Sequence, residues 1–86
     1  MSETRVAVMA IIVERPESVA QLNSTLHGYA QYVIGRMGIP YPKRHVNIIS
    51  VAIDAPQDKI AALAGRIGAI EGVSVKTAYS NVISES

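Results

Sequence analysis

The chain has 86 residues, of which 49% are hydrophobic, and its eight Lys and Arg nearly balance seven Asp and Glu. This composition predicts one globular domain over residues 1–86 and excludes a free-standing nucleic-acid binder that works by phosphate neutralisation. The absence of cysteine excludes disulfides and thiolate metal sites, so oligomerisation is the remaining way to stabilise so small a core.

The first expected element is a strand over residues 6–14, a continuous apolar run rich in β-branched side chains. Such a run is typical of a strand buried on both faces. It is not a signal peptide, because an acid and only one cation precede it and no cleavage pattern follows. It is also about half as long as a bilayer span. We therefore expect a cytoplasmic protein with no membrane segment.

A helix is expected next, because Pro16 suits a first helical turn and apolar residues then recur at three- and four-residue spacing. Gly28 lies within this pattern and should weaken its last turns. The predicted apolar stripe consists of Val19, Leu22, Leu26, Tyr29, Ala30 and Val33.

Two further strands are expected on either side of a turn. Residues 32–42 read YVIGRMGIPYP, and the prolines at 40 and 42 predict an edge strand, because proline cannot donate to a ladder. The segment PKRH turns the chain, and VNIISVAID, residues 46–54, predicts a second strand that is apolar on both sides.

The last expected elements are a helix and a strand. Asp54 is the predicted N-cap of the helix, whose apolar stripe is Ile60, Leu63, Ile67 and Ile70. Residues 73–80 alternate in polarity, which predicts a strand. We expect the domain core to span about residues 5–79 and residues 80–86 to form a frayed tail.

The order of these elements, βαββαβ, predicts an α+β ferredoxin-like sandwich with a four-stranded antiparallel sheet and two helices on one face. The first and third strands should be central and the second and fourth should be edges. The other face of the sheet would then expose a contiguous aliphatic patch larger than monomers usually tolerate. We expect this face, or an edge strand, to be buried in a homodimer or homotetramer.

The candidate ligand site lies at the turn between the second and third strands. Residues 18–53 carry three cations and no carboxylate, which is typical either of a solvated loop or of a patch that accepts a small anionic metabolite. The candidate ligand-binding residues are Arg36, Tyr41, Lys43, Arg44 and His45.

No catalytic or metal-binding residue is predicted. The two histidines, His27 and His45, are far apart in sequence and match no compact metal-ligand spacing. No serine lies in a nucleophile motif, and no pair of residues has a spacing that indicates activation of a nucleophile. The sequence leaves any cofactor unknown, and we expect no enzymatic activity.

Three segments carry a resemblance to a known family: RMGIPY, VNIISVAID and AGRIGAIEGVSVKT, in this order and spacing. Together with the sequence between them, they resemble the iron-only hydrogenase system regulators, over about residues 5–78. That family belongs to the ACT-like group and is related in shape to the C-terminal domain of the nickel-responsive repressor. The resemblance implies a stand-alone regulatory domain, with a transcriptional or hydrogenase-related role, that binds a small molecule or a protein partner and forms oligomers through its sheets.

Some properties of related proteins do not carry over. The first turn reads Glu14-Arg15-Pro16 where amino-acid-binding ACT domains have a glycine, and the nickel repressor's cysteine is absent. No segment precedes the first strand that could form a ribbon-helix-helix DNA reader, so direct DNA binding is not expected. Two alternatives to a ligand-binding regulator stay open: an assembly partner of a hydrogenase maturation protein with no small ligand, and a small enzyme on the same scaffold.

Overall fold

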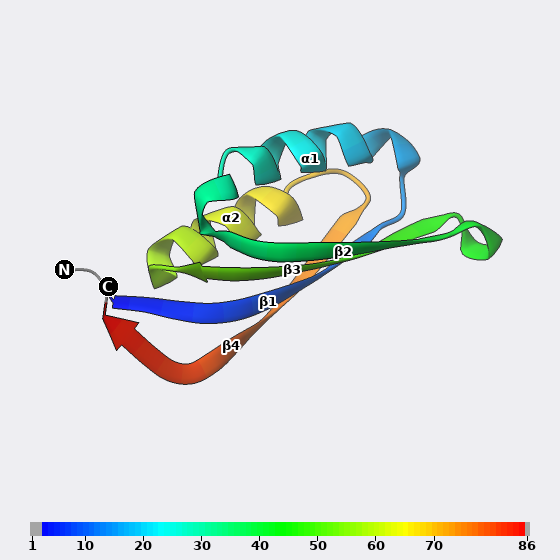
Figure 1. Cartoon of the computed structure of the whole chain (residues 1–86). Helices are drawn as coiled ribbons and strands as arrows, with labels where there is room; N and C mark the ends of the chain where they lie inside the picture. The colour runs from blue at the N-terminus through cyan, green and yellow to red at the C-terminus, as the bar shows by residue number, and fades with distance from the viewer. Residues whose placement is uncertain (1–2, 86) are drawn as a thin grey trace.

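The computed structural model describes residues 3–85 and contains four strands and two helices in the expected order (Figure 1). Three short 3-10 turns, η1, η2 and η3, join them: Pro16–Ser18, Ala30–Tyr32 and Pro42–Arg44. The main elements are β1 (Glu3–Val13), α1 (Val19–His27), β2 (Val33–Tyr41), β3 (Val46–Ala55), α2 (Gln57–Gly68) and β4 (Val73–Glu85).

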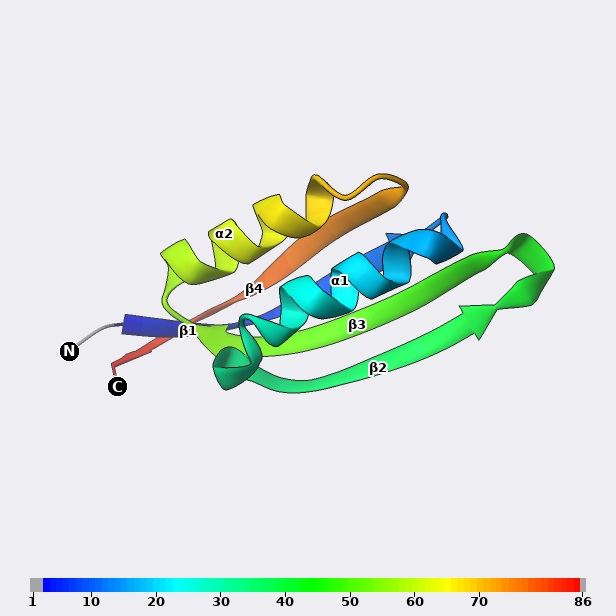
Figure 2. The same ribbon diagram turned by 90° about the horizontal axis from the view of Figure 1, so that it is seen from above.

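The sheet has the strand order β2-β3-β1-β4, and all neighbouring strands are antiparallel. Both helices lie on the same face of this sheet, as the two views in Figures 1 and 2 show. The expected α+β fold is confirmed, including the central position of β1 and β3 and the edge position of β2 and β4.

The core lies between the sheet and the helices. Alternate side chains of β1 and β3 point toward the helices, which present their own apolar stripes. Burying each of the larger side chains contributes about 1.5–3 kcal/mol before the loss of conformational entropy is counted. The fully buried large residues are Met9, Ile11, Val13, Leu22, Val51, Ile53, Ile60, Leu63 and Ile67.

Helix α1 is shorter than its apolar stripe predicted. It ends at His27, with Gly28 as the C-cap, and Tyr29 leaves the helical region at φ −117° and ψ 18°. Gly28 therefore ends the helix rather than only weakening its last turns. Tyr29 and Val33 still pack against the core from outside the helix, which explains why their spacing resembled a continued stripe.

The N-cap prediction for the second helix is wrong. Asp54 lies within β3, paired with Val6, and the N-cap position of α2 is Pro56, which makes no side-chain capping bond. Strand β3 continues one residue further because the buried Ala55 extends its ladder to Arg5. An acid still sits in the first turn of α2, at Asp58, where it favours the helix dipole.

The expected frayed tail is instead part of the sheet. Strand β4 continues through residues 80–85 and pairs with residues 3–5, after an irregularity in the register between Arg5 and Ala7. The Arg5 guanidinium holds this irregularity: Nε and Nη2 donate to the Ser80 carbonyl at 3.1 and 2.9 Å, and the group lies 5.0 Å from the Tyr79 ring centre. Residue 86 lies outside the described residues.

Candidate functional site

The turn between β2 and β3 forms the tip of a hairpin that extends beyond the helices (Figures 1 and 2). Lys43 and Arg44 lie in η3, and His45 follows in the left-handed conformation, at φ 57° and ψ 38°. All three side chains are exposed. Tyr41 precedes the turn, so four of the five predicted ligand-binding residues are neighbours at this tip.

A shallow hollow of about 320 Å³ lies beside the hairpin tip. Tyr41 and His45 contribute to it, whereas Lys43 and Arg44 are outside its lining. Three prolines give it a stiff apolar wall, because their rings fix the backbone. The full lining is Pro16, Pro40, Tyr41, Pro42, His45, Val46 and Asn47.

The fifth predicted residue, Arg36, lies elsewhere. It is five positions before Tyr41 on β2, which is about 17 Å along an extended strand. Its side chain points to the helix side of the sheet, where Nη2 donates to Oδ1 of Asn23 on α1 at 3.0 Å. The structure therefore divides the predicted site between the hairpin tip and a second position.

That second position is a groove of about 270 Å³ between α1 and β2, which we call the α1–β2 groove. This groove was not predicted from the sequence, where His27 was considered only together with His45 and matched no metal-ligand spacing. The sequence signal that could have indicated it is the four-residue spacing of Asn23 and His27, because this spacing puts both polar side chains on one side of a helix. The groove is lined by Asn23, Leu26, His27, Ala30, Val33, Arg36 and Val51.

The helix-free face of the sheet carries a contiguous apolar surface. The strand register puts Ile12, Ile48 and Ile39 side by side in one row across β1, β3 and β2. Two charged residues lie on this face where β1 residues 6–13 pair with the neighbouring strands. They are Asp54, at the end of β3, and Lys76, on the edge strand β4, so both lie toward the margins of the face. The exposed large hydrophobic residues of the face are Val6, Val8, Met37, Ile39, Tyr41 and Ile48, with 38–62% of their surface accessible.

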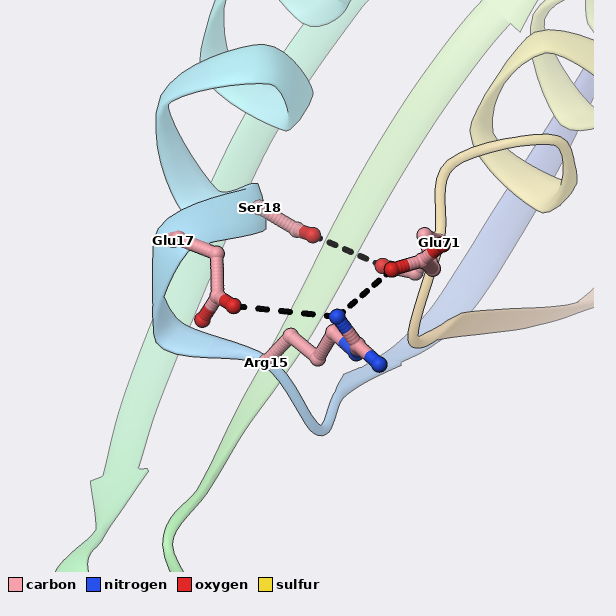
Figure 3. Close-up of polar contacts among 4 residues, drawn as sticks. All are labelled: Arg15, Glu17, Ser18 and Glu71. Carbon is pink, nitrogen blue, oxygen red and sulfur yellow. Dashed lines mark hydrogen bonds and ion pairs between the residues drawn. The ribbon is translucent and has the colours of Figure 1, made fainter.

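A polar cluster joins the β1–α1 turn to the α2–β4 turn (Figure 3). The Ser18 hydroxyl donates to the Glu71 carbonyl at 2.7 Å, and Arg15 forms ion pairs with Glu71 at 2.5 Å and Glu17 at 3.8 Å. The Glu14 N–H also donates to the Gly72 carbonyl at 2.7 Å. Because these groups satisfy one another, the cluster is a structural connection between two turns.

Within residues 3–85, no group of three His, Asp or Glu side chains is placed to hold a metal ion. No helix in this range is both long and apolar enough to cross a membrane.

The strand order and the two helices on one face define an ACT-like, ferredoxin-like α+β domain. Residues 5–77 match a family model described as "TM1266-like: Iron-only hydrogenase system regulator, putative", and the chain belongs to this family. The solved structure of the uncharacterized protein TM1266 from Thermotoga maritima is 32% identical to it. That match has a TM-score of 0.85 and covers 88% of this chain and 96% of that one.

Two more distant structures share the fold alone. The C-terminal domain of the MgtC protein from Mycobacterium tuberculosis is 12% identical, with a TM-score of 0.71, over 88% of this chain and 87% of that one. A formyltetrahydrofolate deformylase from Pseudomonas putida KT2440 is 14% identical, with a TM-score of 0.64, over 90% of this chain and 29% of that one. No curated protein is significantly similar in sequence.

Proposed function

We propose that this protein is a cytoplasmic, non-catalytic regulatory module that acts as a homodimer or homotetramer and responds to a small ligand or a protein partner. The observation that carries the proposal is the apolar helix-free face. Val8 and Ile48 remain 42% and 38% exposed although they occupy the two central strands. Both residues have a neighbouring strand on each side, so a monomer would leave apolar surface in contact with water even at the centre of the sheet.

A second copy of the chain is the proposed occupant of this face. The face is nearly uncharged at its centre, as the cores of protein interfaces are. It is also self-complementary in chemistry, which suits the two-fold interface of a homodimer, where the same patch meets itself. Its central strands and the β2 edge present aliphatic side chains, among them Val8, Ile39 and Ile48, so two such faces can pack together as stacked sheets do.

The hairpin tip is the proposed contact for an anionic ligand or an acidic protein surface. Lys43 and Arg44 are exposed there, and no carboxylate lies between residues 18 and 53 to neutralise them. Tyr41 lies on the helix-free face, so assembly through that face would bring the tip near a neighbouring copy. The projection of the hairpin also favours the alternative function, an assembly partner of a hydrogenase maturation protein with no small ligand.

Sedimentation velocity across the micromolar range tests the assembly. The wild type should sediment as a dimer or tetramer, and Val8→Lys should dissociate it, because a lysine would be buried at the interface without a partner. Ala62→Lys is the matched control on the exposed side of α2 and should leave assembly unchanged. A monomeric wild type, or a folded Val8→Lys variant that assembles normally, would contradict the proposal.

Two binding experiments separate the ligand-binding and assembly roles. The first is a thermal-shift screen with metals, nucleotides, amino acids and organic acids. A small effector that binds the native state should raise the melting temperature of the protein, because binding stabilises that state. A pull-down from anaerobically grown cells that recovers a maturation protein, with Lys43→Ala/Arg44→Ala as the non-binding control, would favour the assembly role.

A further inference from the structure

The α1–β2 groove has the composition of a small-molecule site. Its floor consists of branched aliphatic and small side chains, among them Leu26, Val33 and Val51. Its rim carries the polar side chains of Asn23, His27 and Arg36 from two different elements. Apolar walls with a few polar groups are typical of ligand pockets, and about 270 Å³ is near the small end of their range.

Arg36 is the only fixed positive charge among the described residues that line this groove, and its donors are largely unused. Among the described residues it forms no ion pair, and its one hydrogen bond goes to the neutral amide oxygen of Asn23. A guanidinium has five N–H donors in a planar fork. The bond to Asn23 holds that fork on the helix side of the sheet and leaves donors free for a second acceptor.

From these observations we infer that the α1–β2 groove binds a small monocarboxylate with a branched aliphatic tail. Arg36 would receive the carboxylate, since guanidinium and carboxylate match in planar, two-point geometry. The aliphatic tail would lie on the floor formed by Leu26, Val33 and Val51. This inference rests on the proposed function for its regulatory meaning, and it adds a small-effector site in the groove that is separate from the proposed contact at the hairpin tip.

The charges of the described residues that line the groove disfavour two related ligand classes. An amino acid would bring an ammonium group, and no carboxylate lines the groove to pair with it. A phosphate ester would bring up to two negative charges, whereas one arginine is the only fixed cation in the lining. A carboxylate with an uncharged tail is the ligand that leaves no charge unpaired.

Titration with 4-methylpentanoate tests this inference by two-dimensional amide NMR of the assembled wild-type protein. The amides of Ala30, Val33 and Arg36 should shift and saturate, with a dissociation constant on the order of 1 mM for so small a ligand in an open groove. The neutral 4-methylpentanamide, leucine and inorganic phosphate are the comparison compounds. Each should bind about tenfold more weakly or not at all.

Two variants locate the site. Arg36→Gln should weaken 4-methylpentanoate binding by about tenfold or more, because it removes the charge while leaving an amide in place. Arg66→Gln, which removes an exposed cation in the last turn of α2, is the matched control and should bind as the wild type does. Ala30→Leu should block the groove with a larger side chain, and amide signals distant from it would show that the variant folds.

The results distinguish this inference from the proposed function. The inference would be overturned if 4-methylpentanoate did not saturate the wild type. It would also be overturned if the wild type bound 4-methylpentanamide or phosphate as tightly as 4-methylpentanoate, or if Arg36→Gln bound 4-methylpentanoate as tightly as the wild type does. Sedimentation of the same samples shows whether the oligomer is present. An assembled protein that does not bind 4-methylpentanoate would contradict only the inference, whereas a monomer that binds it would contradict only the proposed assembly.

Discussion

Gly72 is the position where a single methyl group should have the largest local effect outside the core. Its φ is +74°, in the left-handed region that residues with a Cβ rarely adopt. A Cβ built there would lie 2.6 Å from Cγ and 3.0 Å from both Cβ and Cδ of Arg15. Gly72→Ala therefore strains the backbone and also displaces the Arg15 side chain from its pairing with Glu71.

The expected cost has two parts. The left-handed conformation costs about 1–2 kcal/mol for a residue with a Cβ. Displacement of Arg15 costs about 0.5–1 kcal/mol, because its ion pair with Glu71 is solvent-exposed and exposed pairs contribute little. The free energy of unfolding should fall by about 2 kcal/mol, which corresponds to roughly 8–16 °C in the melting temperature of a domain of this size.

Thermal unfolding followed by circular dichroism, at one fixed protomer concentration, measures this cost. Arg15→Ala removes Cγ and Cδ but leaves Cβ, so Gly72→Ala should cost about 0.5–1 kcal/mol less in that background than in the wild type. An equal cost in both backgrounds would show that Arg15 does not oppose the new methyl group. A loss below about 0.5 kcal/mol in the wild type would refute the assigned left-handed conformation.

Two further substitutions test the turns and the second helix. Ser18→Ala should lower the free energy of unfolding by about 1–3 kcal/mol, because Ser18 is only 7% exposed and the Glu71 carbonyl would lose its hydroxyl donor. An unchanged midpoint of urea unfolding would contradict this. Gly65→Ala should raise the stability by about 0.5–1 kcal/mol, since Gly65 is exposed within α2 and an added Cβ meets nothing within 4 Å. A lower melting temperature of Gly65→Ala would contradict that prediction.

The fold could be predicted because its central strands are apolar on both sides. The runs in β1 and β3 gave the strand positions, and the prolines at 40 and 42 placed β2 at an edge. Element ends were less predictable, because they depend on distant contacts. The chain continues in β4 past residue 80 because Arg5 binds the Ser80 carbonyl, and sequence spacing does not reveal that contact.

The candidate site was only partly predictable for a similar reason. Tyr41, Lys43, Arg44 and His45 are close in sequence, so their grouping at one turn followed directly from the predicted hairpin. Arg36 belonged to the same acid-free segment, but alternation along β2 turns it to the helix side. Its actual neighbours come from α1, and pairing between a helix and an edge strand has no local signature in the sequence.

The most direct test of the proposed assembly is an isotope-filtered NOE measurement on a mixture of labelled and unlabelled protein, which detects only contacts between copies. Assembly through the helix-free face predicts intermolecular contacts among the methyl groups of Val8, Ile39 and Ile48, because these residues line that face. An absence of intermolecular contacts at concentrations where the protein is assembled, or contacts confined to the outer edges of β2 or β4, would contradict it.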